Sequence, residues 1–255
     1  MTLINSSVEQ QAAAAWIVAD AIMKGRTGYD TAAYDLWRNA AHAGIPLTGK
    51  DRLHVRAFAH MVFEAAGSQK SHGLAGYVGE WLWYLLTRGH PPEAGRSVEI
   101  LSTPSPTVTD SGGDGIVVYR LPGTSAGFVF RLWEMKKFTG GNDDVDPTIR
   151  KAWQQLSTKG ASYLAAMAWG DKYLAEDTRA FISTLVGQWL DAEPSSGGGV
   201  SVVINETAVP NRAFHTSHTH FSTHTHADAL QGLIVAIDNF EAFAADVREY
   251  VWTAL

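Results

Sequence analysis

The chain contains no cysteine in its 255 residues, so it can form neither a disulfide framework nor a cysteine-ligated zinc site. Long apolar runs are missing as well. The Ala-rich stretch from Ala12 to Ala21 is short and is interrupted by Asp20, which is not typical of a signal peptide or a membrane span. We therefore expect a cytoplasmic protein that has no membrane partner.

Several familiar signatures of enzymes are also absent, among them the Rossmann fingerprint, the P-loop and the nucleophile elbow of serine hydrolases. An excess of positive charge is missing too, because 20 Lys and Arg residues face 26 Asp and Glu residues and the net charge is −6. This balance disfavours non-specific binding to nucleic acid, although a local basic groove is compatible with it. What is present is enough apolar material, 45% of the residues, for a sizeable core.

The order of helix and strand signals predicts the fold class. We expect helices from Val8 to Arg26, Thr31 to Ala43, Asp51 to Ala66, Leu74 to Arg88, Asp146 to about Trp169, Tyr173 to Ala192 and Asn239 to Ala254. We expect strands from Ser97 to Ser102, Gly115 to Leu121, Phe128 to Lys136, Val200 to Asn205 and Leu233 to Ile237, with residues 193–199 as a flexible connection. The pattern predicts an α/β (α+β) protein with a mixed central sheet flanked by helices. A helical N-terminal lobe, residues 1–70, would precede a core formed by residues 71–255.

The stretch from Asp110 to Phe138 contains the most informative residues. Asp114 stands directly before the strand expected from Gly115, and Glu134, twenty positions after Asp114, closes the next strand together with Lys136. Because side chains alternate along a strand, Glu134 and Lys136 share a face with apolar residues earlier in the strand. Two charges on such a face are costly to bury unless they pair or bind a metal. A surface ion pair at a frayed strand end is the alternative.

Carboxylates with open coordination positions suit Mg²⁺ or Mn²⁺. A lysine beside them can orient or activate a water molecule, and together these groups are suited to the attack of water on a phosphodiester. The aspartate, the gap of twenty residues and the Glu-x-Lys triplet resemble the PD-(D/E)xK nuclease superfamily over roughly Leu74 to Glu206. The expected order of elements, α-β-β-β-α-(α)-β, also matches the restriction-endonuclease-like core of that superfamily. The resemblance implies an enzyme that cleaves DNA with Mg²⁺ or Mn²⁺.

The resemblance also implies a role for each matching residue. Asp114 and Glu134 would bind the metal, with the backbone carbonyl of Met135 as a further ligand. Lys136 would position or deprotonate the attacking water and stabilise charge that develops on the phosphate. Asp110 is a second candidate for the metal-binding aspartate, but Asp114 adjoins the expected strand directly.

Two further residues resemble parts of the superfamily's site. Glu80 lies in the middle of a helix that is apolar nearly all round, and it resembles a glutamate that completes the metal site. The alternative is a structural carboxylate that bonds to Tyr77, Tyr84 or an arginine. Gln155, or alternatively Gln154, resembles a glutamine that reaches the active site from the following helix.

Three lysines are candidates for contacts with DNA phosphates. Lys151 and Lys159 flank Gln155 at a spacing of four residues and so share one side of the expected helix. Lys137 follows Lys136 at the end of the strand. The resemblance implies that these lysines contact phosphates. A solvated face of an amphipathic helix explains Lys151 and Lys159 equally well.

Partners are also implied. The helical front lobe, the short chain and the closing helix are similar to the nuclease subunit of Hachiman anti-phage defence systems, which implies a helicase partner. A binding or regulatory subunit that keeps the nuclease fold without catalysis is an alternative. A third hypothesis concerns the histidine tract from His215 to His226, because such tracts can bind Zn²⁺ or Ni²⁺. Its Ser and Thr content favours a polar loop or hairpin instead.

Overall fold

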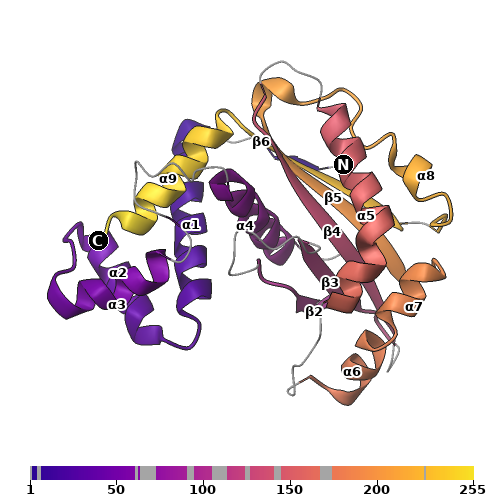
Figure 1. Ribbon diagram of the computed structural model, residues 1–255, viewed down its shortest axis with the longest axis horizontal. Helices are drawn as coiled ribbons and strands as arrows, with labels where there is room; N and C mark the ends of the chain where they lie inside the picture. Colours follow the sequence, from indigo (N-terminus) through magenta and orange to yellow (C-terminus); the bar gives the residue numbers. More distant parts are fainter. Residues whose placement is uncertain are drawn as a thin grey trace.

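The computed structural model describes residues 2–4, 7–60, 63, 73–90, 95–104, 114–123, 127–140, 145–166, 174–226 and 228–255. Within them, a six-stranded mixed sheet has the strand order β1-β6-β5-β4-β3-β2 (Figure 1). The strands are β1 (Thr2–Ile4), β2 (Ser97–Leu101), β3 (Gly115–Arg120), β4 (Phe128–Phe138), β5 (Ser196–Asn205) and β6 (Leu230–Ile237). This sheet confirms the predicted α/β class.

Strands β2, β3 and β4 form an antiparallel meander, whereas β4, β5, β6 and β1 are parallel neighbours. A parallel neighbour requires a crossover connection, and the helices between β4 and β5 provide it. The β3–β4 ladder runs from the pair Arg120 and Phe128 to the pair Gly115 and Trp133. Beyond Trp133, β4 continues to Phe138 beside β5, while the described part of β3 does not extend there. We call this segment, residues 134–138, the C-terminal end of β4.

Helices cover both faces of the sheet (Figure 1). One face carries α5 (Asp146–Ala166), α6 (Glu176–Ile182), α7 (Leu185–Leu190) and α8 (Ser217–His220), and a 3₁₀ turn, η2 (Glu206–Ala208), follows β5. The other face carries α4 (Leu74–Gly89). Alternation along β4 sorts its side chains between the two layers. Phe130 and Leu132 join the core under α5, and Trp133 and Met135 pack with Trp83 of α4.

A helical part lies beside α4 and consists of α1 (Val8–Thr27), α2 (Thr31–Ala43), α3 (Gly49–His60) and α9 (Phe240–Trp252). Trp37 of α2 is fully buried, and its indole N–H donates to the carbonyl of Val251 in α9 at 3.0 Å. Trp16 of α1 packs edge-on against Tyr250 of α9. The helical part therefore includes α9, which follows the sheet in sequence. The division into residues 1–70 and 71–255 stays a prediction.

The expectation of a flexible connection over residues 193–199 is wrong, because Ser196–Gly199 is buried as the first part of β5. Gly199 pairs with Trp133 of β4, and a Cβ atom at Gly199 would lie 2.4 Å from Cδ2 of that indole ring. A glycine is required here because the ring lies directly against the backbone of β5. The glycine run is thus a packing feature of a central strand.

The helix expected over residues 173–192 is also wrong as a single element, because a short turn divides its described part into α6 and α7. Arg120 of β3 holds α6 against the sheet, since its guanidinium pairs with Asp177 at 2.8 Å and with Glu99 at 3.0 Å. In the described part of the chain, no helix combines the length and the apolar character needed to cross a membrane.

Candidate metal-binding active site

The C-terminal end of β4 begins beside Asp114. The last pair of the β3–β4 ladder joins Gly115 to Trp133, and Asp114 is one residue beyond that pair. The Oδ2 atom of Asp114 accepts a hydrogen bond from the backbone N–H of Met135 at 2.5 Å. The aspartate therefore takes the place of a strand partner, and this bond fixes it beside the end of β4 that carries Glu134.

Glu134 lies on the face of β4 that packs against α5. Its side chain is 1% exposed, so the alternative of a surface ion pair at a frayed strand end is wrong. The Nζ atom of Lys136, on the same face, donates to Oε1 of Glu134. The second oxygen, Oε2, is buried and has no hydrogen-bond partner among the described residues. A buried carboxylate oxygen without a partner is costly unless it is protonated or meets a ligand, so this atom is a candidate ligand atom.

Glu80 approaches the same region from α4. Burial raises the pKa of Glu80 to about 7, the charge of Glu134 adds to the rise, and Lys136 opposes it. These interactions show that α4 brings Glu80 within electrostatic reach of the Glu134–Lys136 pair. Tyr77, one of the alternative partners for Glu80, instead accepts a hydrogen bond from Nε of Arg26 at 3.0 Å.

Three acidic side chains therefore act on one another. Burial raises the pKa of Asp114 well above its ordinary range, and the charges of Glu134 and Glu80 add to the rise. Burial also raises the pKa of Glu134, whereas the charge and hydrogen bond of Lys136 lower it. Lys136 and Lys159, the two lysines whose charges lower the pKa of Glu134, do not neutralise three carboxylates, so the region carries excess negative charge when they are ionised. A cation bound among them would relieve this repulsion.

Helix α5 adds polar side chains to the same face of β4. Gln155 donates from Nε2 to the hydroxyl oxygen of Tyr163 at 2.9 Å. Burial raises the pKa of Tyr163, and the charges of Glu134 and Asp114 add to the rise, so this phenol also lies within reach of the carboxylates. Lys159 lies between Gln155 and Tyr163 on the helix, and its charge lowers the pKa of Glu134, opposing the rise that burial causes. Residues four apart line one side of a helix, so these three form one polar ridge.

Tyr163 is the functional candidate that the sequence did not predict, because its ring fits the apolar stripe of α5. The sequence signal that could have identified Tyr163 is its spacing: it follows Gln155 by eight residues, so it lies on the same side of α5 as Gln155 and Lys159. Gln154 lies on the exposed side of α5, and its backbone carbonyl accepts a hydrogen bond from the hydroxyl of Thr158. The geometry thus favours Gln155 over Gln154 as the glutamine of the site.

Most of the predicted site residues are connected to Glu134 by hydrogen bonds or electrostatic interactions, directly or through Tyr163, and these are Glu80, Asp114, Lys136, Gln155 and Lys159. Lys151 is exposed, and Lys137 alternates to the face of β4 opposite Glu134, so their roles stay predictions. The alternative aspartate Asp110 lies outside the described residues. Within the described ranges, no three Asp, Glu or His side chains are grouped closely enough to hold a metal by themselves.

The histidine tract forms α8 and turns instead of a continuous strand pair. His224 is 5% exposed, and its ring lies 5.1 Å from that of Phe221 and 5.5 Å from that of Trp189. Burial lowers the pKa of His224, which favours its neutral form. This histidine is therefore part of an aromatic cluster in the core.

Comparisons with known proteins found no match for the chain among family models, curated proteins or solved structures. What the protein does is therefore inferred from its own residues.

Proposed function

We propose that the protein is a Mg²⁺- or Mn²⁺-dependent endonuclease that hydrolyses phosphodiester bonds in DNA. The observation that carries the proposal is the buried, unpartnered Oε2 atom of Glu134 in a region that also contains Asp114, Glu80 and Lys136. The order of elements supports a restriction-endonuclease-like core, because α4, the meander β2-β3-β4, the crossover helices and the parallel strand β5 follow one another as the resemblance implies.

The oxygen atoms that these side chains offer suit a hard divalent cation in their chemistry. Mg²⁺ and Mn²⁺ prefer oxygen ligands, and the region offers the carboxylates of Asp114, Glu134 and Glu80, with the Met135 carbonyl as a further expected ligand. A cation here would give Oε2 of Glu134 a partner and would reduce the repulsion that raises the carboxylate pKa values. When bound, such an ion supplies a polarised phosphate and a more acidic water molecule.

The remaining groups position the reactants. Lys136 holds its ammonium at Glu134, where it is available to donate to a phosphate oxygen or to hold a water molecule. Gln155 and Tyr163 are joined by a hydrogen bond and orient polar groups on the α5 side of the region. Lys159 adds positive charge there and is proposed to contact a phosphate, as are Lys137 and Lys151 further from the carboxylates.

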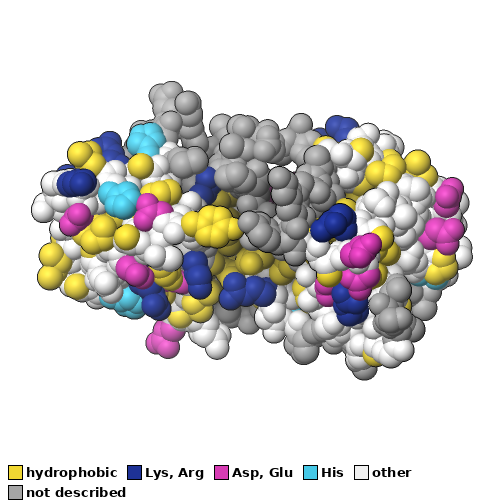
Figure 2. All heavy atoms as spheres, turned by 90° about the horizontal axis from the view of Figure 1, so that it is seen from below, with side chains coloured by type: hydrophobic (Ala, Val, Ile, Leu, Met, Phe, Trp, Pro, Cys, Tyr) yellow, Lys and Arg dark blue, Asp and Glu magenta, His cyan; other side chains and the backbone are white. Residues whose placement is uncertain are grey.

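Surface charge bears on how DNA would reach this site. On the face shown in Figure 2, Lys and Arg side chains are interspersed with Asp and Glu side chains over both parts of the molecule. The whole chain carries a net charge of −6. Both observations support the proposal that a helicase or another subunit of an anti-phage defence system delivers the DNA, since long-range attraction by this chain alone would be weak.

Plasmid cleavage with Mg²⁺ or Mn²⁺ tests the proposal. The parent protein is compared with Glu134→Gln and Lys136→Met, which remove one charge each with little change in volume. Glu241→Gln is the matched control, because Glu241 is an exposed carboxylate in the first turn of α9. We expect metal-dependent cutting by the parent and by the control, and a loss of about 100-fold or more in the two site variants.

Cutting that survives both site substitutions, or that needs no metal, would overturn the assignment. If no protein cuts, the assay is repeated with the co-purified partner, and DNA binding is measured in parallel. DNA binding without cutting, even with the partner, would support the alternative of a non-catalytic binding subunit. Mg²⁺-induced stabilisation of the folded protein, present in the parent and lost in Glu134→Gln, gives a readout of metal binding that does not depend on activity.

A further inference from the structure

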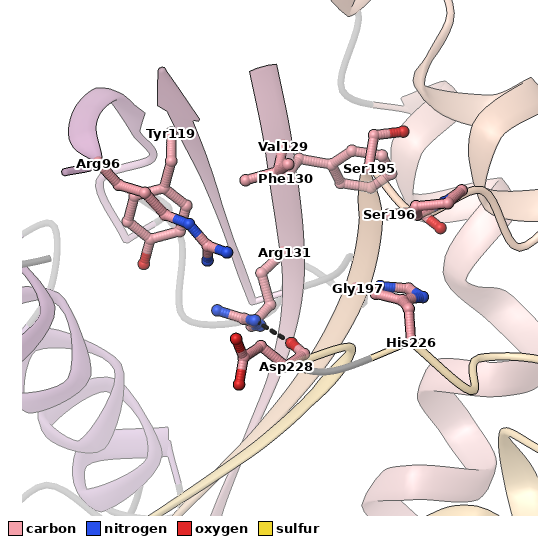
Figure 3. A pocket seen from close by; sticks show the side chains of 11 residues that line it. Arg96, Tyr119, Val129, Phe130, Arg131, Ser195, Ser196, Gly197, His226 and Asp228 are labelled. Atoms are coloured by element: carbon pink, nitrogen blue, oxygen red, sulfur yellow. Dashed lines mark hydrogen bonds between the residues drawn. The ribbon is translucent and has the colours of Figure 1, made fainter. Parts of the chain in front are cut away.

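The two arginines of the sheet strands are held by partners within the fold. Arg131 of β4 lines the pocket shown in Figure 3, where its guanidinium donates to the backbone carbonyl of Asp228. Arg120 of β3 pairs with Glu99 and Asp177. These cations therefore have structural roles, whereas the helical part contains basic side chains of a different kind.

Helix α3 carries three basic side chains without such partners. Lys50, Arg52 and Arg56 are exposed, and their side chains form no hydrogen bond or ion pair with any other residue that the structure describes. Arg52 and Arg56 are four residues apart, so they lie on one side of the helix, about 6 Å apart along its axis. His60, which is also exposed, continues this row by another four residues. We call Arg52, Arg56 and His60 the basic ridge.

The acidic residue of α3 lies away from the basic ridge. Asp51 precedes the buried Val55 by four residues, so it is on the same side of the helix as Val55. Leu53 lies between the basic ridge and Lys50, and it is 67% exposed. The exposed face of α3 therefore combines unpaired positive charge with an uncovered apolar side chain, in a chain whose net charge is −6.

An exposed aromatic ring lies beside this face. Tyr29, in the turn between α1 and α2, is fully exposed. The next residue, Asp30, holds that turn against α3, because its Oδ2 atom lies 2.6 Å from Nε2 of His54. His54 follows Lys50 by four residues and so lies on the Lys50 side of the helix. The basic ridge and the turn that carries Tyr29 therefore flank Leu53 from opposite sides.

We propose that this face of α3 binds single-stranded DNA. Proteins that bind single strands combine positive side chains that follow the backbone with aromatic rings on which bases stack. Here the basic ridge contacts the phosphates, and Tyr29 and Leu53 contact the bases. A duplex keeps its bases paired and stacked inside, so it offers no base to Tyr29.

This surface is separate from the candidate active site. In Figure 1, α2 and α3 lie on the side of α1 away from the sheet, whereas the carboxylates lie at the sheet and α4. The choice of DNA over RNA rests on the proposed function, but binding of a single strand does not require cleavage. A protein that binds the strand without cutting DNA would therefore keep this proposal and lose only the proposed function.

Fluorescence anisotropy with a labelled oligo-dT strand in EDTA tests the proposal, because metal-dependent cleavage does not occur there. Arg52→Gln/Arg56→Gln removes two charges of the basic ridge. Arg88→Gln/Arg212→Gln is the matched control, because both arginines are exposed outside α3. We expect the ridge variant to bind about tenfold or more weakly. Its slope of log affinity against log salt should fall by roughly 1.4, or 0.7 for each lost phosphate contact. The control should keep the parent's slope.

Tyr29 provides an independent test of base stacking. Tyr29→Ala should weaken binding about fivefold or more, whereas Tyr29→Phe keeps the ring and should bind like the parent. Leu190→Ala is the control for loss of an exposed apolar side chain, because Leu190 is 68% exposed on α7. It should also bind like the parent.

Unlabelled competitors identify the class of ligand. Oligo-dT should compete best, and duplex DNA, oligo-U and poly-glutamate should compete less well. A stronger competitor among these three would overturn the proposal and assign the face to a duplex, to RNA or to an acidic protein. The absence of binding by the parent, equal losses in the ridge variant and its control, or full binding by Tyr29→Ala would overturn it as well.

Discussion

The indole ring of Trp133 lies directly against the backbone at Gly199, its partner across the β4–β5 ladder. The contact fills the space that any side chain at residue 199 would need. Trp133 in turn packs against Trp83 of α4, with the ring centroids 5.8 Å apart. One glycine in a central strand therefore sets the distance between the sheet and α4, the helix that carries Glu80.

Gly199→Ala should lower the free energy of unfolding by about 1 to 3 kcal/mol, because the added methyl group forces the Trp133 ring to shift in a well-packed core. Urea unfolding measures this change. Gly187→Ala is the control, since Gly187 is exposed in α7 and a Cβ atom there would meet no atom within 4 Å. That control should be neutral or stabilising by up to about 1 kcal/mol. Equal stability of the two variants would contradict the packing described for Trp133.

Tyr163→Phe removes the hydroxyl that accepts the hydrogen bond from Gln155. We expect a stability loss of about 1 kcal/mol and a fall in the cleavage rate with little change in the affinity for DNA, because Gln155 loses its fixed orientation. Single-turnover cleavage and DNA binding, measured separately, distinguish the two effects. Tyr34→Phe is the control: the hydroxyl of Tyr34 donates to Asp20 at 2.8 Å in the helical part. An equal rate loss in both variants would argue against a positioning role for Tyr163.

Glu80 should make the stability of the metal-free protein depend on pH. Burial raises its pKa to about 7 in the folded chain, from an ordinary value of 4.5. The protonated form is thus favoured by folding, so the stabilisation is complete below pH 4.5 and is lost as the pH rises through about 7. Over that interval, the unfolding free energy should fall by at most about 3 kcal/mol from this group.

Urea unfolding at pH 5 and pH 8, in the parent and in Glu80→Gln, measures that contribution. The variant should lose less stability than the parent between the two pH values, because a glutamine does not ionise. A divalent cation should reduce the loss in the parent, since it favours the ionised carboxylate. The same pH dependence in parent and variant would show that Glu80 is not desolvated as described.

Local sequence signals were sufficient for several elements. The expected helix from Thr31 to Ala43 has the same bounds as α2, because both of its ends are fixed by nearby residues. The side chain of Asp30 accepts a hydrogen bond from the N–H of Ala33 at 3.0 Å, and Gly44 adopts a left-handed conformation with φ of 64°. The alternation of side chains along a strand, which predicts that Glu134 and Lys136 share one face, is also a local signal.

Other features depend on contacts between distant segments, which a sequence pattern does not specify. The glycine run from Ser196 to Gly199 has the composition of a linker, and close contacts with distant residues, such as that of the Trp133 ring with Gly199, explain why it is a buried strand. Pairing of β1 with β6 joins Thr2–Ile4 to a strand at the other end of the chain. The approach of Glu80 to Glu134 likewise requires α4 to dock on the sheet.

The packing of α9 on α1 and α2 affects the order in which the protein can form during translation. Trp37 and the carbonyl that it bonds in Val251 are 214 residues apart. At the usual rate of synthesis, roughly 10 to 40 seconds separate the two residues on the ribosome. During that interval, helices α1 to α3 have been synthesised but α9, which packs against them, has not. The apolar faces of these nascent helices are therefore covered only after α9 has been synthesised.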